Sequence, residues 1–290
     1  MRIPESELIL NEDGSIYHLN LLPEDIATTI ILVGDPQRVP KVSGYFDEIL
    51  VKKEKREFVT HTGFYRNKKI TVLSTGIGAG NIDIVLNELD ALVNIDFASR
   101  KIKTHTTALT IVRIGTSGSL QPEIAVDDFL ISKYAAGFDG LLHFYDSRHI
   151  QHIDIQEAIV KETEWYIDKP APYVVSCSPT LAQVFKEEGI HEGFTVTSPG
   201  FYGPQSRTLR LKPQDTLLNE RLASFNYKGL RITNLEMETA AIYGLSALLG
   251  HHAVSLNCIL ANRSNKTFTK DGHKSVKRLI EFALQRLSAD

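Results

Sequence analysis

The stretch Thr29-Ile30-Ile31-Leu32-Val33-Gly34-Asp35-Pro36 shows how the chain is built, because a run of β-branched and aliphatic residues ends there in a sharp turn. Such a run predicts a buried strand. Asp35 suits a helix N-cap and Pro36 suits the first helical position, so we expect a helix that holds Arg38 to follow. The stretch therefore predicts a strand, a turn and a helix in direct succession.

The same alternation continues along the rest of the chain. Apolar residues recur at helical spacing from residue 81 to about residue 97, and Gly189 and Gly250 are suited to end later helices. We expect strands at residues 51–62, 69–74, 108–114, 129–132, 173–177, 194–197, 230–235 and 253–261, and helices at residues 81–97, 180–188, 236–249 and 274–287. Nearly continuous apolar strands that alternate with helices indicate a sheet covered on both faces. The sequence therefore predicts one α/β domain over residues 1–290, with three α/β/α layers.

The composition argues against several classes of protein. The 290 residues are 42% hydrophobic and 23% charged, which is typical of a globular protein. With 32 Lys and Arg against 35 Asp and Glu, the formal net charge is −3, so neither nucleic acid nor a membrane is expected as a partner. Cys177 and Cys258 lie far apart, which disfavours a disulfide framework and a thiolate zinc site and fits a reducing compartment. Residues 1–14 lack the apolar core of a signal peptide, so a soluble cytoplasmic protein is predicted.

Residues 74–81 (STGIGAGN) place three glycines between a predicted strand and a predicted helix. Such a turn lets a phosphate approach a helix N-terminus and nearly matches the dinucleotide motif G-x-G-x-x-G. The third glycine of that motif falls at Asn81, however, and Asp96 follows the helix rather than a strand. A tight turn with close helix packing is therefore the preferred interpretation.

Arg113 interrupts an apolar strand immediately before residues 115–119 (GTSGS). A guanidinium in such surroundings costs several kcal/mol unless it meets an anion or other acceptors. Thr116 adds a hydroxyl nearby, and Arg38 follows the separate turn at Gly34, so two arginines beside two glycine turns could hold a free phosphate. For either arginine considered alone, an internal pair with a carboxylate is an equally good interpretation.

Two carboxylates, Glu236 and Glu238, lie between a predicted strand and an apolar helix. Acidic groups at that boundary are stabilised by the helix N-terminus. Capping of the helix is the simplest role for Glu236. Glu238 projects from a small, apolar first turn, where hydrogen bonds to the vicinal hydroxyls of a sugar are a reasonable alternative.

A Gly- and Pro-rich loop contains Phe201, Gln205 and Arg207. An aromatic face can stack on a planar base, glutamine offers a donor beside an acceptor, and arginine offers only donors. This set suits an imide such as uracil, although an ordinary aromatic-Gly-Pro turn is the alternative. His149 and His152 lie in a polar segment, and the sequence holds no H-E-x-x-H motif, so no metal site is expected.

Several motifs occur in one order between residues 17 and 263. They are residues 34–38 (GDPQR), 56–58 (REF), 74–78 (STGIG), 113–118 (RIGTSG), 201–207 (FYGPQSR) and 236–238 (EME). In this combination the sequence resembles the nucleoside phosphorylase superfamily, and within it the uridine phosphorylases. The loop at residues 201–207 is similar to the one that recognises uracil, and Asn262 stands where purine-specific members have an aspartate.

The resemblance implies a fold and a reaction. The fold is a single-domain, three-layer α/β/α sandwich with a central mixed sheet of the phosphorylase/hydrolase-like type. The reaction is reversible phosphorolysis of uridine to uracil and α-ribose 1-phosphate in nucleoside salvage, with inorganic phosphate as co-substrate and no cofactor. Because the glycosidic bond breaks through an oxocarbenium-like state, a dianion must lie below C1′ and the site must stabilise charge on the departing base.

The resemblance also assigns roles to residues. It implies phosphate binding by Gly34, Arg38, Arg56, Arg113 and Thr116; ribose binding by His18, Glu236, Met237 and Glu238; base binding by Phe201, Gln205 and Arg207; and catalysis by Arg113, Glu238 and Arg263. His18 and Arg56 would come from a neighbouring subunit, which implies a homodimer at least. A hexamer stays open, because Asn81 replaces a serine that some members use at a cation site between subunits and residues 95–106 are longer than in compact members.

Other functions remain compatible with the sequence. They are a purine nucleoside phosphorylase, a nucleosidase that uses water, and a nucleoside-binding protein without turnover. The phosphate arginines disfavour water as the nucleophile, and the loop at residues 201–207 disfavours purines.

Overall fold

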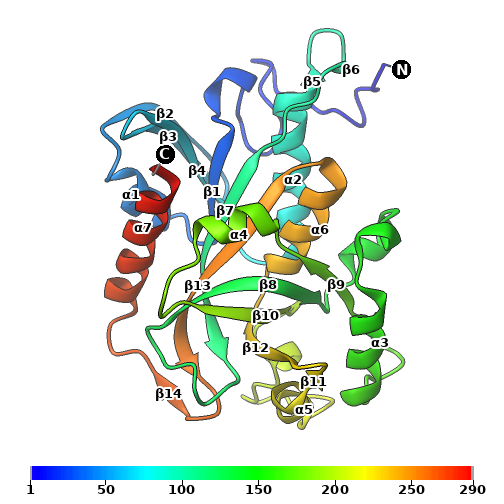
Figure 1. Ribbon diagram of the computed structural model, residues 1–290. Coiled ribbons are helices and arrows are strands. Elements are labelled where there is room, and N and C mark those ends of the chain that lie inside the picture. The colour runs from blue at the N-terminus through cyan, green and yellow to red at the C-terminus, as the bar shows by residue number, and fades with distance from the viewer. Residues whose placement is uncertain (1, 289–290) are drawn as a thin grey trace.

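A sheet that mixes parallel and antiparallel strands forms the centre of the computed structural model, which describes residues 2–288 (Figure 1). In order across the sheet, the strands are β11 (Asn226–Tyr227), β12 (Leu230–Glu236), β10 (His191–Thr197), β8 (Phe129–Gly137), β13 (His252–Asn262), β7 (Thr110–Ser119), β1 (Thr29–Val33), β4 (Lys68–Ser74), β3 (Phe58–Tyr65) and β2 (Glu48–Lys55). β9 (Tyr173–Ser176) pairs with β8, and β14 (Thr267–Phe268) pairs with β13. A separate hairpin joins β5 (Ile95–Asp96) to β6 (Lys101–Ile102).

Two parallel groups make up most of this sheet. β4, β1, β7 and β13 are parallel neighbours, and so are β8, β10 and β12. The groups meet where β13 runs antiparallel to β8, and β12 also pairs with β7. That second pairing joins Leu235 to Gly118, so the carboxyl-terminal halves of β12 and β7 lie side by side. The sheet therefore curls into a closed ring of β7, β13, β8, β10 and β12.

Helices cover both sides of the region around β1 and β7. α1 (Arg38–Ser43) and α7 (Gly272–Ser288) lie on one side, and α2 (Ala79–Asn94) and α6 (Thr239–Leu249) lie on the other (Figure 1). The shorter elements are α3 (Ile153–Glu162), α4 (Pro179–Val184) and α5 (Leu218–Ser224), with 3-10 turns η1 (Pro23–Asp25), η2 (Leu141–Phe144), η3 (Arg148–Ile150) and η4 (Gly203–Gln205). The predicted three-layer α/β/α class is confirmed.

The expected strand at residues 51–62 is wrong, because β2 and β3 are joined there by a hairpin turn. Lys55 pairs with Phe58, which leaves Arg56 and Glu57 as the turn residues. Arg56 has a φ of +55°, a left-handed conformation that hairpin turns favour. No Gly, Asn or Asp marks this turn in the sequence. The REF motif therefore lies at a hairpin tip and not within one strand.

β7 continues past the predicted end at residue 114 and includes the stretch that we expected to be a turn. Arg113 and Gly115 lie on the same face of this strand, because side chains alternate along it. A Cβ at Gly115 would overlap the Arg113 guanidinium. Glycine is therefore needed at this position to make room for the arginine side chain.

Helix boundaries also differ in places from the predictions. α4 ends at Val184, and Gly189 lies in the following turn, so Gly189 does not end that helix. Gly250 does end α6, with a φ of +78°. α6 begins at Thr239, which leaves Glu236 at the end of β12 and Glu238 as the N-cap residue.

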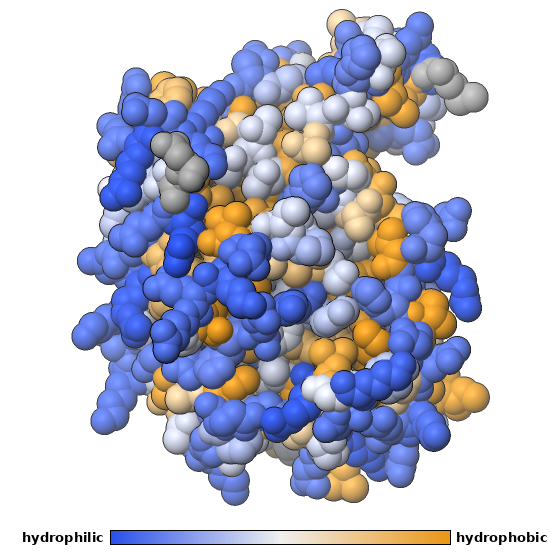
Figure 2. Space-filling view, viewed as in Figure 1, coloured by the Kyte–Doolittle hydropathy of each residue, from blue (hydrophilic) through white to orange (hydrophobic). Residues whose placement is uncertain are grey.

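The two cysteine thiols are buried and free. Burial raises the pKa of Cys177 to about 11 and the pKa of Cys258 to about 12, so both stay protonated at neutral pH. Between residues 2 and 288, no helix combines the length and the apolar character that a membrane span requires. On the face in Figure 2, hydrophilic residues predominate and hydrophobic residues form small separate patches.

Candidate active site

A cavity of about 890 Å³ lies beside the carboxyl ends of β1, β4 and β12 and along the second half of β7. Loops at this end of parallel strands are the usual place for ligands in α/β folds. Its lining brings together most of the predicted site residues: Gly34, Arg38, Arg113, Thr116, Phe201, Gln205, Arg207, Glu236, Met237 and Glu238. We call it the main cavity.

Arg113 forms a buried ionic cluster at the wall of the main cavity. Its Nη2 lies 2.6 Å from Oε2 of Glu238 and 3.1 Å from Oε2 of Glu236. Nη1 donates to Oγ of Ser255 and Oδ1 of Asn257. Burial lowers the pKa of Arg113, but the two carboxylates outweigh it and raise the pKa above its ordinary value. The internal carboxylate pair considered from the sequence is therefore present.

The two carboxylates of this cluster use their oxygens differently. Oε2 of Glu236 accepts the backbone N–H groups of Glu238 and Thr239, each at 2.9 Å, and its Oε1 accepts the hydroxyl of Thr197 at 2.6 Å. Glu236 thus caps the start of α6, as its simplest role predicted. Oε1 of Glu238 accepts the backbone N–H of Gly78 at 2.8 Å. Glu238 keeps more acceptor capacity for a ligand, because a carboxylate offers about four acceptor positions.

Arg38 supplies a second guanidinium to the main cavity. Its Nη1 donates to the carbonyl of Ile114 at 3.1 Å, and within residues 2–288 it forms no ion pair. Burial and the charge of Arg113 lower the pKa of Arg38. A bound anion would compensate both effects. Gly34 and Thr116 border the cavity near this arginine and offer a backbone N–H and a hydroxyl.

Phe201, Gln205 and Arg207 form a connected unit at another part of the lining. Nη1 of Arg207 donates to the carbonyl of Phe201 at 2.6 Å and to Oε1 of Gln205 at 2.5 Å. The guanidinium lies 3.7 Å from the centre of the Phe201 ring, in a cation–π contact. Burial and the nearby charge of Arg263 lower the pKa of Arg207 to about 10. Gln205 is buried, whereas half of Phe201 is exposed.

Three predicted site residues do not line the main cavity. Arg263 donates to the backbone carbonyl of Gln205, a cavity residue, at 2.6 Å. Nδ1 of His18 lies 2.6 Å from Oε1 of Glu88 on α2. Arg56 is exposed at the tip of the β2–β3 hairpin. A single chain therefore does not bring His18, Arg56 and Arg263 into contact with the cavity.

Sequence analysis missed other residues that border the cavity. Glu57 lines it and accepts a hydrogen bond from Nδ2 of Asn81 at 3.2 Å. The REF motif could have identified Glu57, since the glutamate is part of it. Leu260 and Phe268 also line the cavity, but no motif marks either residue.

Comparison with known proteins identifies the family. Residues 28–288 match the family model of the phosphorylase superfamily. This chain belongs to the phosphorylase superfamily. The predicted resemblance to this superfamily is confirmed.

Relatives in the superfamily match almost the whole chain. A uridine phosphorylase of Thermococcus kodakarensis is 30% identical and covers 96% of this chain and 88% of its own length. A uridine phosphorylase of Klebsiella aerogenes is 27% identical, with 94% and 99% covered. A solved nucleoside phosphorylase of Trypanosoma brucei, described as showing uridine phosphorylase activity, superposes with a TM-score of 0.86 at 29% identity and covers 98% of this chain and 100% of that one.

The ionic cluster gives a stability prediction for this superfamily member. Arg113→Met should lower the free energy of unfolding by about 3–5 kcal/mol, because Glu236 and Glu238 would be left buried without their cation. Urea unfolding at neutral pH measures the change. Adding Glu236→Gln and Glu238→Gln to the same variant should recover part of the loss, since the unpaired charges are then removed. An Arg113→Met protein as stable as the unmodified one would contradict the prediction.

Proposed function

We propose that this protein catalyses the reversible phosphorolysis of uridine and related pyrimidine nucleosides to uracil and α-ribose 1-phosphate in nucleoside salvage. The observation that carries the proposal is one cavity lined both by Arg38, Arg113 and Thr116 and by the Gln205–Arg207 pair. The first set suits an oxyanion and the second suits the edge of an imide. The names of the relatives support the same reaction.

Phosphate is proposed to bind to Arg38, Thr116 and the backbone of Gly34. Arg38 forms no ion pair within the described chain, so its charge is available to an anion. Arg113 is held by Glu236 and Glu238, and it contributes positive charge and the N–H at Nε, for which residues 2–288 provide no hydrogen-bond acceptor. These fixed charges would position phosphate as the nucleophile. The proposed reaction involves no covalent enzyme intermediate.

Ribose is proposed to bind at Glu238 and Met237. Glu238 accepts one N–H from Gly78 and one from Arg113, and its remaining acceptor positions suit the ribose hydroxyls. Met237 is half-buried on the cavity lining and can pack under the sugar. Glu236 is already saturated by Thr197 and the start of α6, so we propose that it acts by holding Arg113 and Glu238 in place.

The base is proposed to lie between Phe201 and the Gln205–Arg207 pair. The Gln205 amide and the Arg207 guanidinium address the O2, N3 and O4 edge of uracil. Arg207 would also stabilise negative charge on the departing base, because its guanidinium lines the cavity beside Gln205. Arg263 holds the backbone of Gln205 and adds positive charge behind the base site.

The reaction proposed needs inorganic phosphate as co-substrate and no other cofactor. We further propose that residues 1–290 act as one domain in the cytoplasm, without nucleic acid or membrane as a partner. We also propose a homodimer as the smallest active unit. Its support is that His18 and Arg56 do not line the cavity of their own chain.

Uracil release from uridine should require phosphate. Phosphate is the nucleophile, so uridine in phosphate-free buffer should remain intact and added phosphate should yield equal amounts of uracil and ribose 1-phosphate. Chromatography of both products measures this, with inosine and thymidine as parallel substrates. Equal uracil release without phosphate would indicate a nucleosidase, faster cleavage of inosine would indicate a purine enzyme, and no cleavage at all would indicate a binding protein.

Base selection should depend on the Gln205–Arg207 pair. Gln205→Ala and Arg207→Ala should each lower kcat/KM for uridine by about 10- to 100-fold, because hydrogen bonds to the imide edge are lost. The KM for phosphate should stay nearly unchanged. Arg210→Ala is the matched control, since Arg210 is exposed in the same loop and does not line the cavity. A parallel rise in the phosphate KM would refute the assignment of Gln205 and Arg207 to base binding alone.

A shared site predicts complementation between two inactive variants. Arg56→Ala and Arg38→Ala should each be inactive alone. After mixing and subunit exchange, half of the dimers would be mixed and each would hold one complete site, so about a quarter of the unmodified activity should return. Tagged subunits and mass measurement establish the exchange. No recovery after proven exchange, or full activity in a proven monomer, would disprove the shared site.

A further inference from the structure

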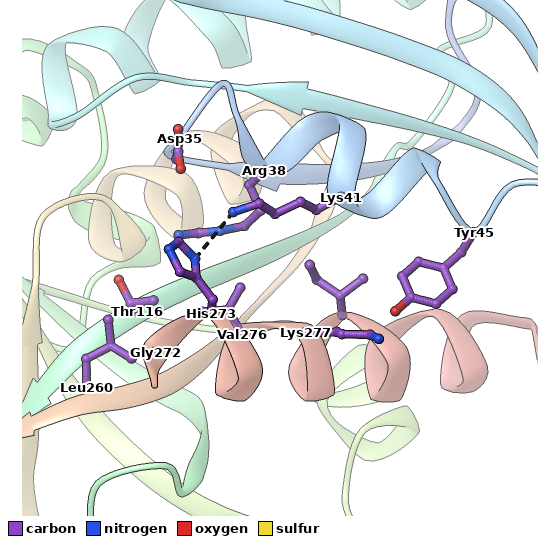
Figure 3. Close-up of a pocket in the computed structure, with 11 residues that line it drawn as sticks. Asp35, Arg38, Lys41, Tyr45, Thr116, Leu260, Gly272, His273, Val276 and Lys277 are labelled. Atoms are coloured by element: carbon purple, nitrogen blue, oxygen red, sulfur yellow. Dashed lines mark hydrogen bonds between the residues drawn. The ribbon is translucent and has the colours of Figure 1, made fainter. Parts of the chain in front are cut away.

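A second cavity of about 700 Å³ lies between α1 and α7. We call it the α1–α7 cavity (Figure 3). Arg38 and Thr116 line both this cavity and the main cavity, as do Asp35 and Leu260. The proposed phosphate residues therefore border two spaces, and Phe201 and Met237 line only the main cavity.

The α1–α7 cavity carries basic side chains from both helices. Lys41 belongs to α1, and His273 and Lys277 belong to α7. Nζ of Lys41 lies 3.4 Å from Nδ1 of His273, and Figure 3 shows the Arg38 guanidinium beside this pair. An ammonium offers only donors, and an imidazole carries at least one N–H in either tautomer. These groups present several N–H donors in one place.

Negative groups in this cavity are fewer than positive ones. Asp35 lines it, and its Oδ1 already accepts the backbone N–H of Gln37 at 2.9 Å. Glu281 lies nearby. Its Oε1 accepts the hydroxyl of Tyr45 at 2.7 Å and lies 3.9 Å from Nζ of Lys277. The whole chain has a formal net charge of −3, so the positive character of this cavity is local. Apolar walls from Val276 and Ile280 strengthen its field, because low-dielectric walls focus electrostatic potential.

We propose that the α1–α7 cavity is a second anion-binding subsite, which collects inorganic phosphate and passes it to Arg38 and Thr116. The inference rests on the proposed phosphorolysis, and it adds a route for phosphate that is separate from the nucleoside side. The ligand is a small oxyanion, because basic donors outnumber carboxylates in the α1–α7 cavity and the Phe201–Gln205–Arg207 unit that suits a base lines only the main cavity.

The test replaces charges in the α1–α7 cavity that lie outside the proposed catalytic and binding residues. The Lys41→Gln/Lys277→Gln variant should raise the KM for phosphate about three- to tenfold, because local attraction of the anion is lost. Its kcat and its KM for uridine should stay within about twofold of the unmodified values. His273→Ala, which removes the ring N–H beside Lys41 as a donor to the anion, is a second variant and should raise the phosphate KM in the same direction.

Lys274→Gln is the matched control, because Lys274 is exposed on α7 and does not line the cavity. A thermal unfolding titration with inorganic phosphate alone gives a readout without turnover. The half-saturating phosphate concentration should rise in the cavity variants and not in the control. An unchanged phosphate KM and half-saturation, an equal effect of Lys274→Gln, or an equal rise in the uridine KM would overturn the inference. Absence of phosphate-dependent cleavage by the unmodified protein would instead reject the proposed function.

Discussion

The buried Arg113 guanidinium, with Glu236 and Glu238 around it, is the interaction on which the rest of the site depends. It links β7 to the end of β12 and to the start of α6. Glu236 also caps α6, so the same charge that compensates the arginine fixes the helix. Gly115 must lack a side chain because the guanidinium occupies that space. Cluster, helix start and strand geometry therefore constrain one another.

The fold was predictable where one local rule decides the structure. Apolar runs such as Thr29–Val33 are fully buried strands, and Gly250 ends α6 in the left-handed conformation that glycine adopts easily. Prediction failed where residue type and backbone conformation do not follow the usual pattern. Gly115 was interpreted as a turn residue, but it serves a side chain two positions earlier in β7. The hairpin at Arg56 was hidden because an arginine takes the conformation that usually identifies Gly or Asn.

The candidate site shows a similar division. Motifs located most of the cavity lining, because each lies directly after or near the end of a strand. Sequence could not decide between a phosphate role and a carboxylate partner for Arg113, since both need the same buried guanidinium. A guanidinium has five N–H donors, so carboxylate pairing leaves room for an anion at Nε. Nor could the sequence find Phe268, because β14 reaches the cavity only through its pairing with β13.

The charge balance of one chain bears on how the proposed site could hold a phosphate. The two positive charges of Arg38 and Arg113 are equalled in number by the two negative charges of Glu236 and Glu238, and Asp35 and Glu57 also border the main cavity. Arg207 belongs to the base end of the lining and is engaged with Phe201 and Gln205. A phosphate dianion thus meets little net positive charge from these groups alone, although desolvated anions need compensation. In the proposed dimer, Arg56 of a neighbouring subunit would be one source of that compensation. The basic groups of the proposed subsite between α1 and α7 would be another, and the two would act at different stages. The α1–α7 groups would raise the local phosphate concentration before binding, whereas a neighbouring arginine would hold the nucleophile during bond cleavage.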